Sequence, residues 1–260
     1  MKSNISTFAV PCVLLAVLSA AIPARGDDSG RHADSFDSDG VKIAYVTAGK
    51  GDPVILVHGL YSSAAMNWEA PGIFDMLAKH YYVVALDLRG HGNSDKPADA
   101  AAYGQPMADD ILRLMDHLNI QKAQVVGYSL GGIIVMKFVI DHPDRVVAAT
   151  LGGMGWLRQG SVFQETFTRL GGAGQTPAVC AQSVAKLAVT AEQVESVKVP
   201  VNILVGDRDP CKKMYVDPLE KLRPDWPVTV ITNAGHITCI VKPQFKAELL
   251  KGIEEHAVAK

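Results

Sequence analysis

The sequence predicts a single α/β domain, with a mainly parallel central sheet and helices on both of its faces. Apolar runs without polar alternation, such as residues 54–57, are typical of strands that are covered on both sides. Segments of helical period alternate with these runs, which is the order expected for parallel strands joined by crossover helices. With 260 residues, 48% of them apolar and 20% charged, the chain is long enough to bury one large core.

The first 26 residues are interpreted as a signal peptide. Lys2 gives a positive start, residues 8–22 are almost entirely apolar, and small residues follow up to Ala24. An uncleaved membrane anchor is the alternative, but this apolar run is shorter than the ~20 residues that a membrane span needs. We therefore expect residues 27–260 to form one mature domain that is secreted or periplasmic, without stable membrane insertion.

The predicted elements begin after a polar leader over residues 27–39, which we expect to be flexible. Residues 41–49 and 53–59, separated by a Gly/Asp/Pro turn, are predicted as a hairpin followed by a buried strand. A helical stretch then extends to about Lys79. Further strands are expected at residues 82–87, 123–127, 145–151, 201–206 and 228–232, and further helices at residues 105–118, 133–141 and 242–256.

One segment, at about residues 152–198, interrupts this alternation. It contains no clear strand and is rich in glycine. Because it lies between two strands of the sheet, we interpret it as a short helical lid insertion. Its aromatic side chains Trp156, Phe163 and Phe167 either line an apolar acyl pocket or form the core of the lid itself.

The hexapeptide GYSLGG at residues 127–132 lies between a buried strand and a helix, and it predicts a nucleophilic serine. A serine on such a turn takes strained backbone angles, and the glycines two residues before and after Ser129 keep the strand and the helix from colliding. The amino end of the following helix favours developing negative charge. The alternative role for Ser129 is that of a helix N-cap, where serine is common.

A serine hydroxyl needs a histidine to accept its proton and a carboxylate to orient that histidine. In this strand–turn–helix arrangement both partners follow the serine along the chain, with the acid first. His236, after the last predicted strand, is the candidate base; Asp209, at the tip of the strand before it, is the candidate acid, with Asp207 as its alternative. The other histidines precede the serine or lie in or beside helices: His58, His80, His91, His117, His142 and His256.

Two backbone amides are predicted to form the oxyanion hole. One belongs to Leu130, directly after the nucleophile, and the other to Leu60, in the loop after the first buried strand. We interpret His58 as a structural residue that supports this loop. Asp87 and Arg89 are expected to tie down the loop after the next strand rather than to contact substrate.

These segments together resemble the α/β-hydrolase superfamily over about residues 35–258, and the chain is similar to its small esterase and perhydrolase-like branches. The resemblance implies the α/β-hydrolase fold, a Ser-Asp-His triad and no metal or organic cofactor. Dehalogenases and soluble epoxide hydrolases share part of the pattern but carry aspartate as the nucleophile, and Ser129 argues against both. The matching segments are HGL (58–60), DLRGHGNSDKP (87–97), GYSLGG (127–132), GDRDP (206–210) and GH (235–236).

Cys180, Cys211 and Cys239 remain after removal of the signal peptide, a pattern too sparse for a disulfide scaffold or a zinc site. Cys211 follows the acid loop and Cys239 follows His236. Because these two loops must approach each other, we expect a Cys211–Cys239 disulfide.

The expected function is hydrolysis of small carboxylic esters through an acyl-enzyme, with a small-molecule ester as the partner. A carbon–carbon bond hydrolase with the same triad and a non-catalytic ligand-binding protein of the same fold are the alternatives. The formal net charge of −2, with both signs interspersed, indicates no nucleic-acid partner. The oligomeric state and the physiological substrate stay open.

Overall fold

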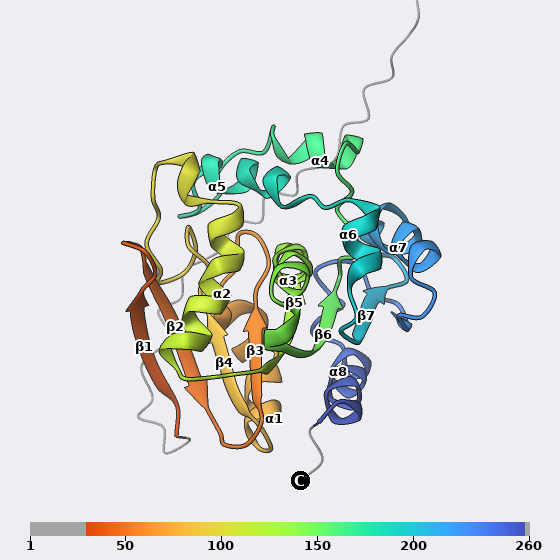
Figure 1. The fold of residues 1–260 in the computed structure, drawn as a ribbon. Helices are drawn as coiled ribbons and strands as arrows, with labels where there is room; N and C mark the ends of the chain where they lie inside the picture. Colours follow the sequence, from red (N-terminus) through yellow and green to blue (C-terminus); the bar gives the residue numbers. More distant parts are fainter. Residues whose placement is uncertain (1–29, 258–260) are drawn as a thin grey trace, which may run out of the picture.

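The computed structural model describes residues 30–257, so the segment interpreted as a signal peptide lies outside the described residues. Within this range one eight-stranded sheet crosses the molecule in the order β1-β2-β4-β3-β5-β6-β7-β8 (Figure 1). The β1/β2 and β2/β4 pairs are antiparallel, and all other pairs are parallel. The strands are β1 (His32–Asp37), β2 (Lys42–Ala48), β3 (Pro53–Val57), β4 (Tyr82–Leu86), β5 (Ala123–Tyr128), β6 (Val146–Gly152), β7 (Val201–Gly206) and β8 (Val228–Ile231).

Helices cover both faces of the sheet, as predicted. One core contains Ile55 and Val57 of β3 with the helices α2 and α3, and the other contains Val54 and Leu56 with α1 and α8. Successive side chains of β3 thus enter opposite cores, which explains why this strand has no polar alternation. The α-helices are α1 (Ile73–Ala78), α2 (Gln105–His117), α3 (Leu130–Asp141), α4 (Val162–Phe167), α5 (Ala178–Ser183), α6 (Ala191–Ser196), α7 (Asp217–Leu222) and α8 (Pro243–Glu255).

The prediction of a flexible leader over residues 27–39 is wrong, because residues 32–37 form the strand β1. The hairpin is also placed differently: β2 pairs with β1 and β4, whereas β3 lies between β4 and β5. The β1–β2 turn has Asp39 and Gly40 at its centre, with φ angles of 59° and 77°. Asp-Gly is a strong signal for a tight two-residue hairpin turn, and sequence reasoning overlooked it.

The segment between β6 and β7 contains α4, α5 and α6 and lies over the carboxyl ends of the strands (Figure 1). Short irregular helices connect other elements: η1 (Ala65–Glu69), η2 (Ala100–Ala102), η3 (Pro143–Arg145), η4 (Val184–Leu187) and η5 (Lys212–Val216). Among residues 30–257, no helix has the length and apolar character required to cross a membrane.

The outer edge of β8 is covered by a side chain from α8. Gln244 accepts a hydrogen bond from the Thr232 amide at 3.0 Å and donates one to the Val230 carbonyl at 3.4 Å. At the other end of the sheet, β1 carries mostly polar and exposed side chains, and Phe36 is its one buried residue.

Candidate active site

Ser129 lies between β5 and α3 in a strained conformation, with φ 54° and ψ −117°. α3 begins at Leu130, earlier than the predicted start near Ile133, so Ser129 occupies the N-cap position. Its side chain makes no capping hydrogen bond there. The structure therefore does not support the alternative role as a helix cap.

The glycines on either side of Ser129 permit very close backbone contacts. A Cβ atom on Gly127 would lie 2.2 Å from the Gly131 carbonyl oxygen, and one on Gly131 would lie 2.0 Å from the Val57 carbonyl oxygen. Both distances are far below van der Waals contact. Only glycine lets α3 start this close to β3 and β5, which presents Ser129 at the carboxyl edge of the sheet.

The structure brings the three predicted side chains together from three loops. His236 Nε2 lies 2.8 Å from Ser129 Oγ, and His236 Nδ1 lies 2.8 Å from Asp209 Oδ2. The Asp209 side chain is fully buried, whereas that of His236 is 32% exposed. An acceptor on Nδ1 selects the tautomer with the proton on that nitrogen, which leaves Nε2 free to accept the serine proton.

Asp209 and its alternative, Asp207, have different partners. The second Asp209 oxygen, Oδ1, accepts a hydrogen bond from the Cys211 amide at 2.8 Å. Asp207 accepts hydrogen bonds from the Asn233 and Ala234 amides, both at 2.9 Å, and these bonds lower its pKa. Asp207 thus holds the loop before His236 but makes no hydrogen bond to the imidazole.

Tyr128 supports His236 from the strand that carries the serine, a role that sequence reasoning missed. Its hydroxyl donates a hydrogen bond to the His236 carbonyl, and its ring centroid lies 5.8 Å from that of the imidazole. The side chain is buried, and burial raises the pKa of Tyr128 well above its usual value. The hydroxyl is therefore a permanent donor at neutral pH.

The segments that carry the two predicted oxyanion amides adjoin Ser129. A Cβ atom on Gly59, which precedes Leu60, would lie 3.2 Å from Ser129 Cβ, so the loop after β3 runs directly beside the serine. Asn67 Oδ1 accepts a hydrogen bond from the Gly59 amide at 2.7 Å and fixes this loop. Within residues 30–257, the Leu60 and Leu130 amides have no protein acceptor.

His58 has the structural role that was expected of it. The buried ring accepts a hydrogen bond from the Leu88 amide at Nε2 and contacts the Gly59 carbonyl through Nδ1 at 2.8 Å. These partners require the neutral ring with its proton on Nδ1, and burial lowers the pKa of His58 accordingly.

Asp87 and Arg89 are also structural, as expected. Asp87 accepts hydrogen bonds from the Ala64 and Asn93 amides. Arg89 makes a buried two-point ion pair with Asp110, at 2.7 and 2.6 Å. These bonds join loops to one another and to α2, and within residues 30–257 neither side chain is hydrogen-bonded to Ser129 or His236.

The aromatic residues of the insertion pack within it and against η5. Trp156 Nε1 donates to the Val189 carbonyl at 2.9 Å, and the Phe163 ring lies 5.4 Å from that of Tyr215. The Tyr61 hydroxyl, in the loop after β3, donates to the Gly171 carbonyl at 2.6 Å. The insertion is thereby joined to the loop that carries the Leu60 amide.

The expected Cys211–Cys239 disulfide is wrong, because both cysteines are free thiols in the structure. Each thiol has its own surroundings: Cys211 faces Asp209, and Cys239 is buried beside Tyr128. Approach of the two loops is achieved through the His236–Asp209 hydrogen bond, without a covalent link.

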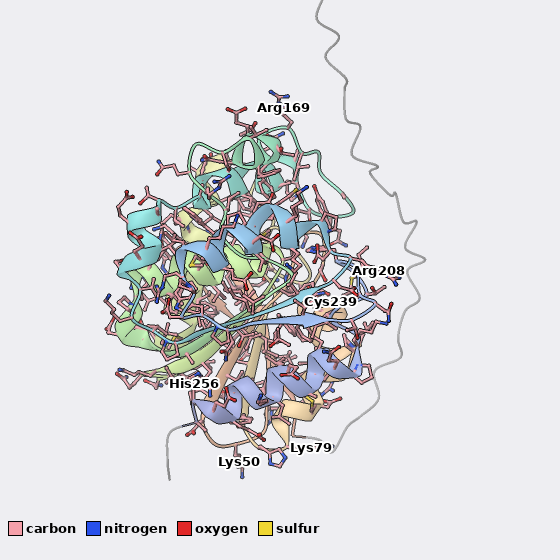
Figure 2. The ribbon with its side chains drawn as sticks, turned by 90° about the vertical axis from the view of Figure 1, so that its right-hand side faces the viewer. Lys50, Lys79, Arg169, Arg208, Cys239 and His256 are labelled. Carbon is pink, nitrogen blue, oxygen red and sulfur yellow. The ribbon has the colours of Figure 1, made fainter. Side chains whose placement is uncertain are left out.

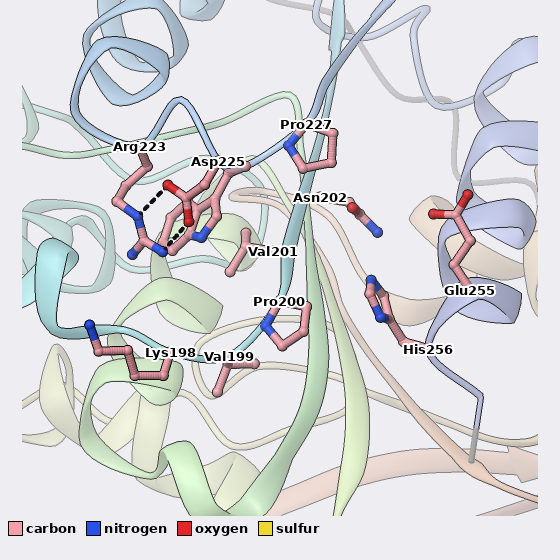
Figure 3. Close-up of a pocket in the computed structure, with 11 residues that line it drawn as sticks. Lys198, Val199, Pro200, Val201, Asn202, Arg223, Asp225, Pro227, Glu255 and His256 are labelled. Carbon is pink, nitrogen blue, oxygen red and sulfur yellow. Dashed lines mark hydrogen bonds and ion pairs between the residues drawn. The ribbon is translucent and has the colours of Figure 1, made fainter. Parts of the chain in front are cut away.

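Two hollows in the described part of the chain lie away from Ser129. One, of about 270 Å³, surrounds the start of β7 and is lined by the Arg223–Asp225 pair and His256 (Figure 3). In Figure 2 His256 lies at the lower left, whereas Cys239 and Arg208, which follow the carboxyl ends of β8 and β7, lie to the right. The other, of about 550 Å³, lies in the insertion beside Trp156.

A family profile described as alpha/beta hydrolase fold matches residues 52–170 of the chain. This range contains Leu60, Ser129 and Leu130, whereas Asp209 and His236 lie beyond it.

Two curated relatives match with part of their length. 2-Hydroxymuconate semialdehyde hydrolase from Pseudomonas sp. strain CF600 is 34% identical over 116 residues, 44% of this chain and 40% of that protein. Soluble epoxide hydrolase from Corynebacterium sp. strain C12 is 36% identical over 107 residues, 41% of this chain and 36% of that protein. The chain therefore spans less than half the length of these relatives.

Among solved structures, a thermophilic esterase from Thermogutta terrifontis superimposes with a TM-score of 0.73. The alignment covers 88% of this chain and 99% of the esterase, at 22% sequence identity. At this identity the likeness is one of fold.

Proposed function

Because the chain belongs to the α/β-hydrolase superfamily, we propose that it is a serine hydrolase that cleaves small carboxylic esters through an acyl-enzyme. The observation that carries this proposal is the continuous hydrogen-bonded series from Ser129 through His236 to Asp209. A serine at the nucleophile position argues against epoxide hydrolysis, in which aspartate attacks.

In the first half of the proposed reaction, Ser129 Oγ attacks the ester carbonyl while its proton passes to His236 Nε2. Asp209 stabilises the resulting imidazolium. The carbonyl oxygen becomes an anion that the Leu60 and Leu130 amides stabilise, each by about 3 kcal/mol of barrier. Collapse of this intermediate transfers the proton from Nε2 to the leaving alcohol and leaves Ser129 acylated.

In the second half, His236 removes a proton from water, which attacks the acyl group. The same amides stabilise the second oxyanion. Return of the proton to Ser129 Oγ releases the carboxylic acid and restores the enzyme. No cofactor is required for either half.

A carbon–carbon bond hydrolase is the second candidate, because one matching relative is named 2-hydroxymuconate semialdehyde hydrolase. The same three residues would serve that reaction, and the contacts that separate the two substrate classes lie in the insertion. Substrate profiling with esters and with ring-cleavage diketones decides between them.

The primary experiment is a burst assay with p-nitrophenyl esters from acetate to octanoate. We expect one equivalent of p-nitrophenol per protein in the first turnover, and no burst from Ser129→Ala. A folded wild-type protein without activity on any ester would reject ester hydrolysis. Turnover of a diketone would then support the second candidate, and no turnover at all would support a ligand-binding protein.

The assignment of Asp209 as the acid of the triad is tested by separate substitution of two neighbouring carboxylates. We expect Asp209→Asn to lower kcat by about 10⁴-fold, because the imidazole then loses its tautomer and its counter-charge. Asp207→Asn is the matched control and should lower kcat by less than about tenfold, since its bonds hold only the loop. Equal losses would contradict the assignment of Asp209.

We also propose export of the chain, on the basis of its apolar amino-terminal segment. Mass spectrometry of the protein recovered outside the cytoplasm should show an amino terminus after Ala24 or Gly26. A membrane-bound protein that retains Lys2 would support the uncleaved anchor instead.

A further inference from the structure

Three metal-ligating side chains of different chemistry meet beside the serine. One ligand atom each from Asp209, Cys211 and His236 lies within 4.8 Å of the other two. The Asp209 carboxylate is buried, whereas Cys211 is partly exposed and His236 is 32% exposed. A small ion can thus reach the cluster from the side of the imidazole.

We propose that this cluster is an inhibitory site for a zinc-like transition metal, with Asp209, Cys211 and His236 as protein ligands. Carboxylate, thiolate and imidazole are the three ligand types that Zn²⁺ takes, and three protein ligands leave its fourth position for water. Mg²⁺ and Ca²⁺ prefer six or more oxygen ligands, which this cluster does not offer. That the site is inhibitory rests on the proposed function; that it binds metal does not.

Zinc would occupy the position that the Nδ1 proton now holds between His236 and Asp209. That gap is 2.8 Å between Nδ1 and Oδ2, and tetrahedral zinc needs about 3.4 Å between two ligand atoms at 2.0–2.2 Å from the metal. An opening of about 0.6 Å is within the reach of a partly exposed imidazole on a loop. Binding shifts the imidazole to the tautomer with its proton on Nε2, and it releases the Cys211 thiol proton to solvent.

The thiol of Cys211 is the ligand that the metal must ionise. Its sulfur lies within 4.8 Å of a carboxylate oxygen of Asp209, so it stands in a negative field. A bound dication supplies the opposite field and deprotonates a coordinating thiol.

Metal on Nδ1 would stop the proposed reaction. His236 Nε2 would then carry the ring proton and could not accept the proton of Ser129, and Asp209 would no longer be available to orient the imidazole. We therefore expect reversible inhibition by Zn²⁺, relieved by a chelator.

Calorimetric titration of the mature protein with ZnCl₂ tests the site without reference to turnover. We expect one Zn²⁺ per chain, a Kd at least tenfold weaker for Cys211→Ser, and a Kd within twofold of wild type for Cys239→Ser. Cys239→Ser is the matched control, because this thiol is close by but outside the cluster. If Cys211→Ser does not fold, His236→Gln tests the same ligand set with the same expected tenfold loss.

Equal zinc affinity in wild type and Cys211→Ser, or an equal loss in Cys239→Ser, would overturn the proposal. A parallel ester assay should show inhibition by ZnCl₂, full recovery with EDTA and no effect of MgCl₂. If zinc binds as expected but no ester is turned over, the site stands and the proposed function fails. If esters are turned over and zinc binds without Cys211, the proposed function stands and the proposed metal site fails.

Discussion

At the scale of single residues, the Tyr128 hydroxyl couples the strand of the nucleophile to the backbone of the general base. Tyr128→Phe leaves the His236 carbonyl without this donor and lets the loop shift. We expect the free energy of unfolding to fall by about 1–3 kcal/mol and kcat to fall by about 10- to 100-fold, with a much smaller change in KM.

The control for this prediction is Tyr45→Phe. Tyr45 is also buried and pairs with His117 Nε2 at 3.2 Å, far along the sheet from Ser129. Its loss should lower stability without lowering kcat. Equal effects of the two variants on kcat would mean that Tyr128 only supports the fold.

The residues of the site differ in how visible they are in the sequence. Ser129, Asp209 and His236 were predictable because each follows a recognisable strand, and the ends of parallel strands meet at one edge. Tyr128 was not, because its bond to a loop 108 residues away depends on the three-dimensional path of that loop. The predicted Cys211–Cys239 disulfide was wrong for a different reason. The two loops do lie close together, but the proximity of loops does not fix the direction of a side chain.

At the scale of elements, the start of α3 depends on its contact with β3. A Cβ atom on Gly131 would meet the Val57 carbonyl at 2.0 Å, so Gly131→Ala must displace the helix and Ser129 with it. We expect a loss of about 3 kcal/mol of stability and a fall in kcat of more than about 100-fold.

Gly40→Ala provides the comparison, since Gly40 has φ 77° but no atom within 4 Å of the position that a Cβ would take. It should cost only about 1–2 kcal/mol of backbone strain and leave kcat unchanged. Denaturant unfolding and the ester assay measure both quantities. A fully active Gly131→Ala would contradict the packing argument.

The turn of the β1–β2 hairpin is held to α2 through a buried charge. Asp110 accepts hydrogen bonds from Arg89 and from Ser38 Oγ, which directly follows β1. Asp110→Asn leaves the Arg89 guanidinium buried without its counter-charge, and we expect a loss of about 3–5 kcal/mol.

Asp116→Asn is the matched control, because Asp116 pairs with Arg145 at 2.8 Å but is 59% exposed. Urea unfolding should show a loss of less than about 1 kcal/mol for that variant. Losses of similar size would show that the buried pair contributes no more than a surface pair.

The elements themselves were predictable to different degrees. The parallel strands carry their own signal, because burial on both faces makes them almost continuously apolar. β1 carries no such signal, since its polar side chains face solvent and its position depends on backbone bonds to β2. Only the Asp39-Gly40 turn indicated the hairpin.

At the scale of the whole molecule, two buried histidines connect folding to pH. Burial, reinforced by the neighbouring His58, lowers the pKa of His91 to about 3, and burial lowers the pKa of His58 as well. The unfolded chain, with a histidine pKa of about 6.5, therefore binds protons that the native chain does not. Stability must fall as the pH falls below about 6.5, and for His91 the loss stops growing near its native pKa.

Urea unfolding between pH 4 and pH 8 measures this dependence. Between its native pKa and its unfolded pKa, each histidine lowers the free energy of unfolding by up to about 1.4 kcal/mol for every unit by which the pH falls. His91→Asn should flatten the slope between pH 6 and pH 4, whereas substitution of the exposed His80 by asparagine should not. An unchanged slope in His91→Asn would contradict a neutral buried His91.

The covered edge of β8 has a consequence for behaviour at high protein concentration. An open sheet ends in two rows of backbone groups that can recruit a strand from another molecule and start aggregation. Here Gln244 is hydrogen-bonded to the Val230 carbonyl and the Thr232 amide at one edge of the sheet. At the other edge, the polar and acidic side chains of β1 disfavour pairing with another strand. The weak point for self-association is therefore Gln244, and an apolar residue there would shorten the time for which a concentrated solution stays clear.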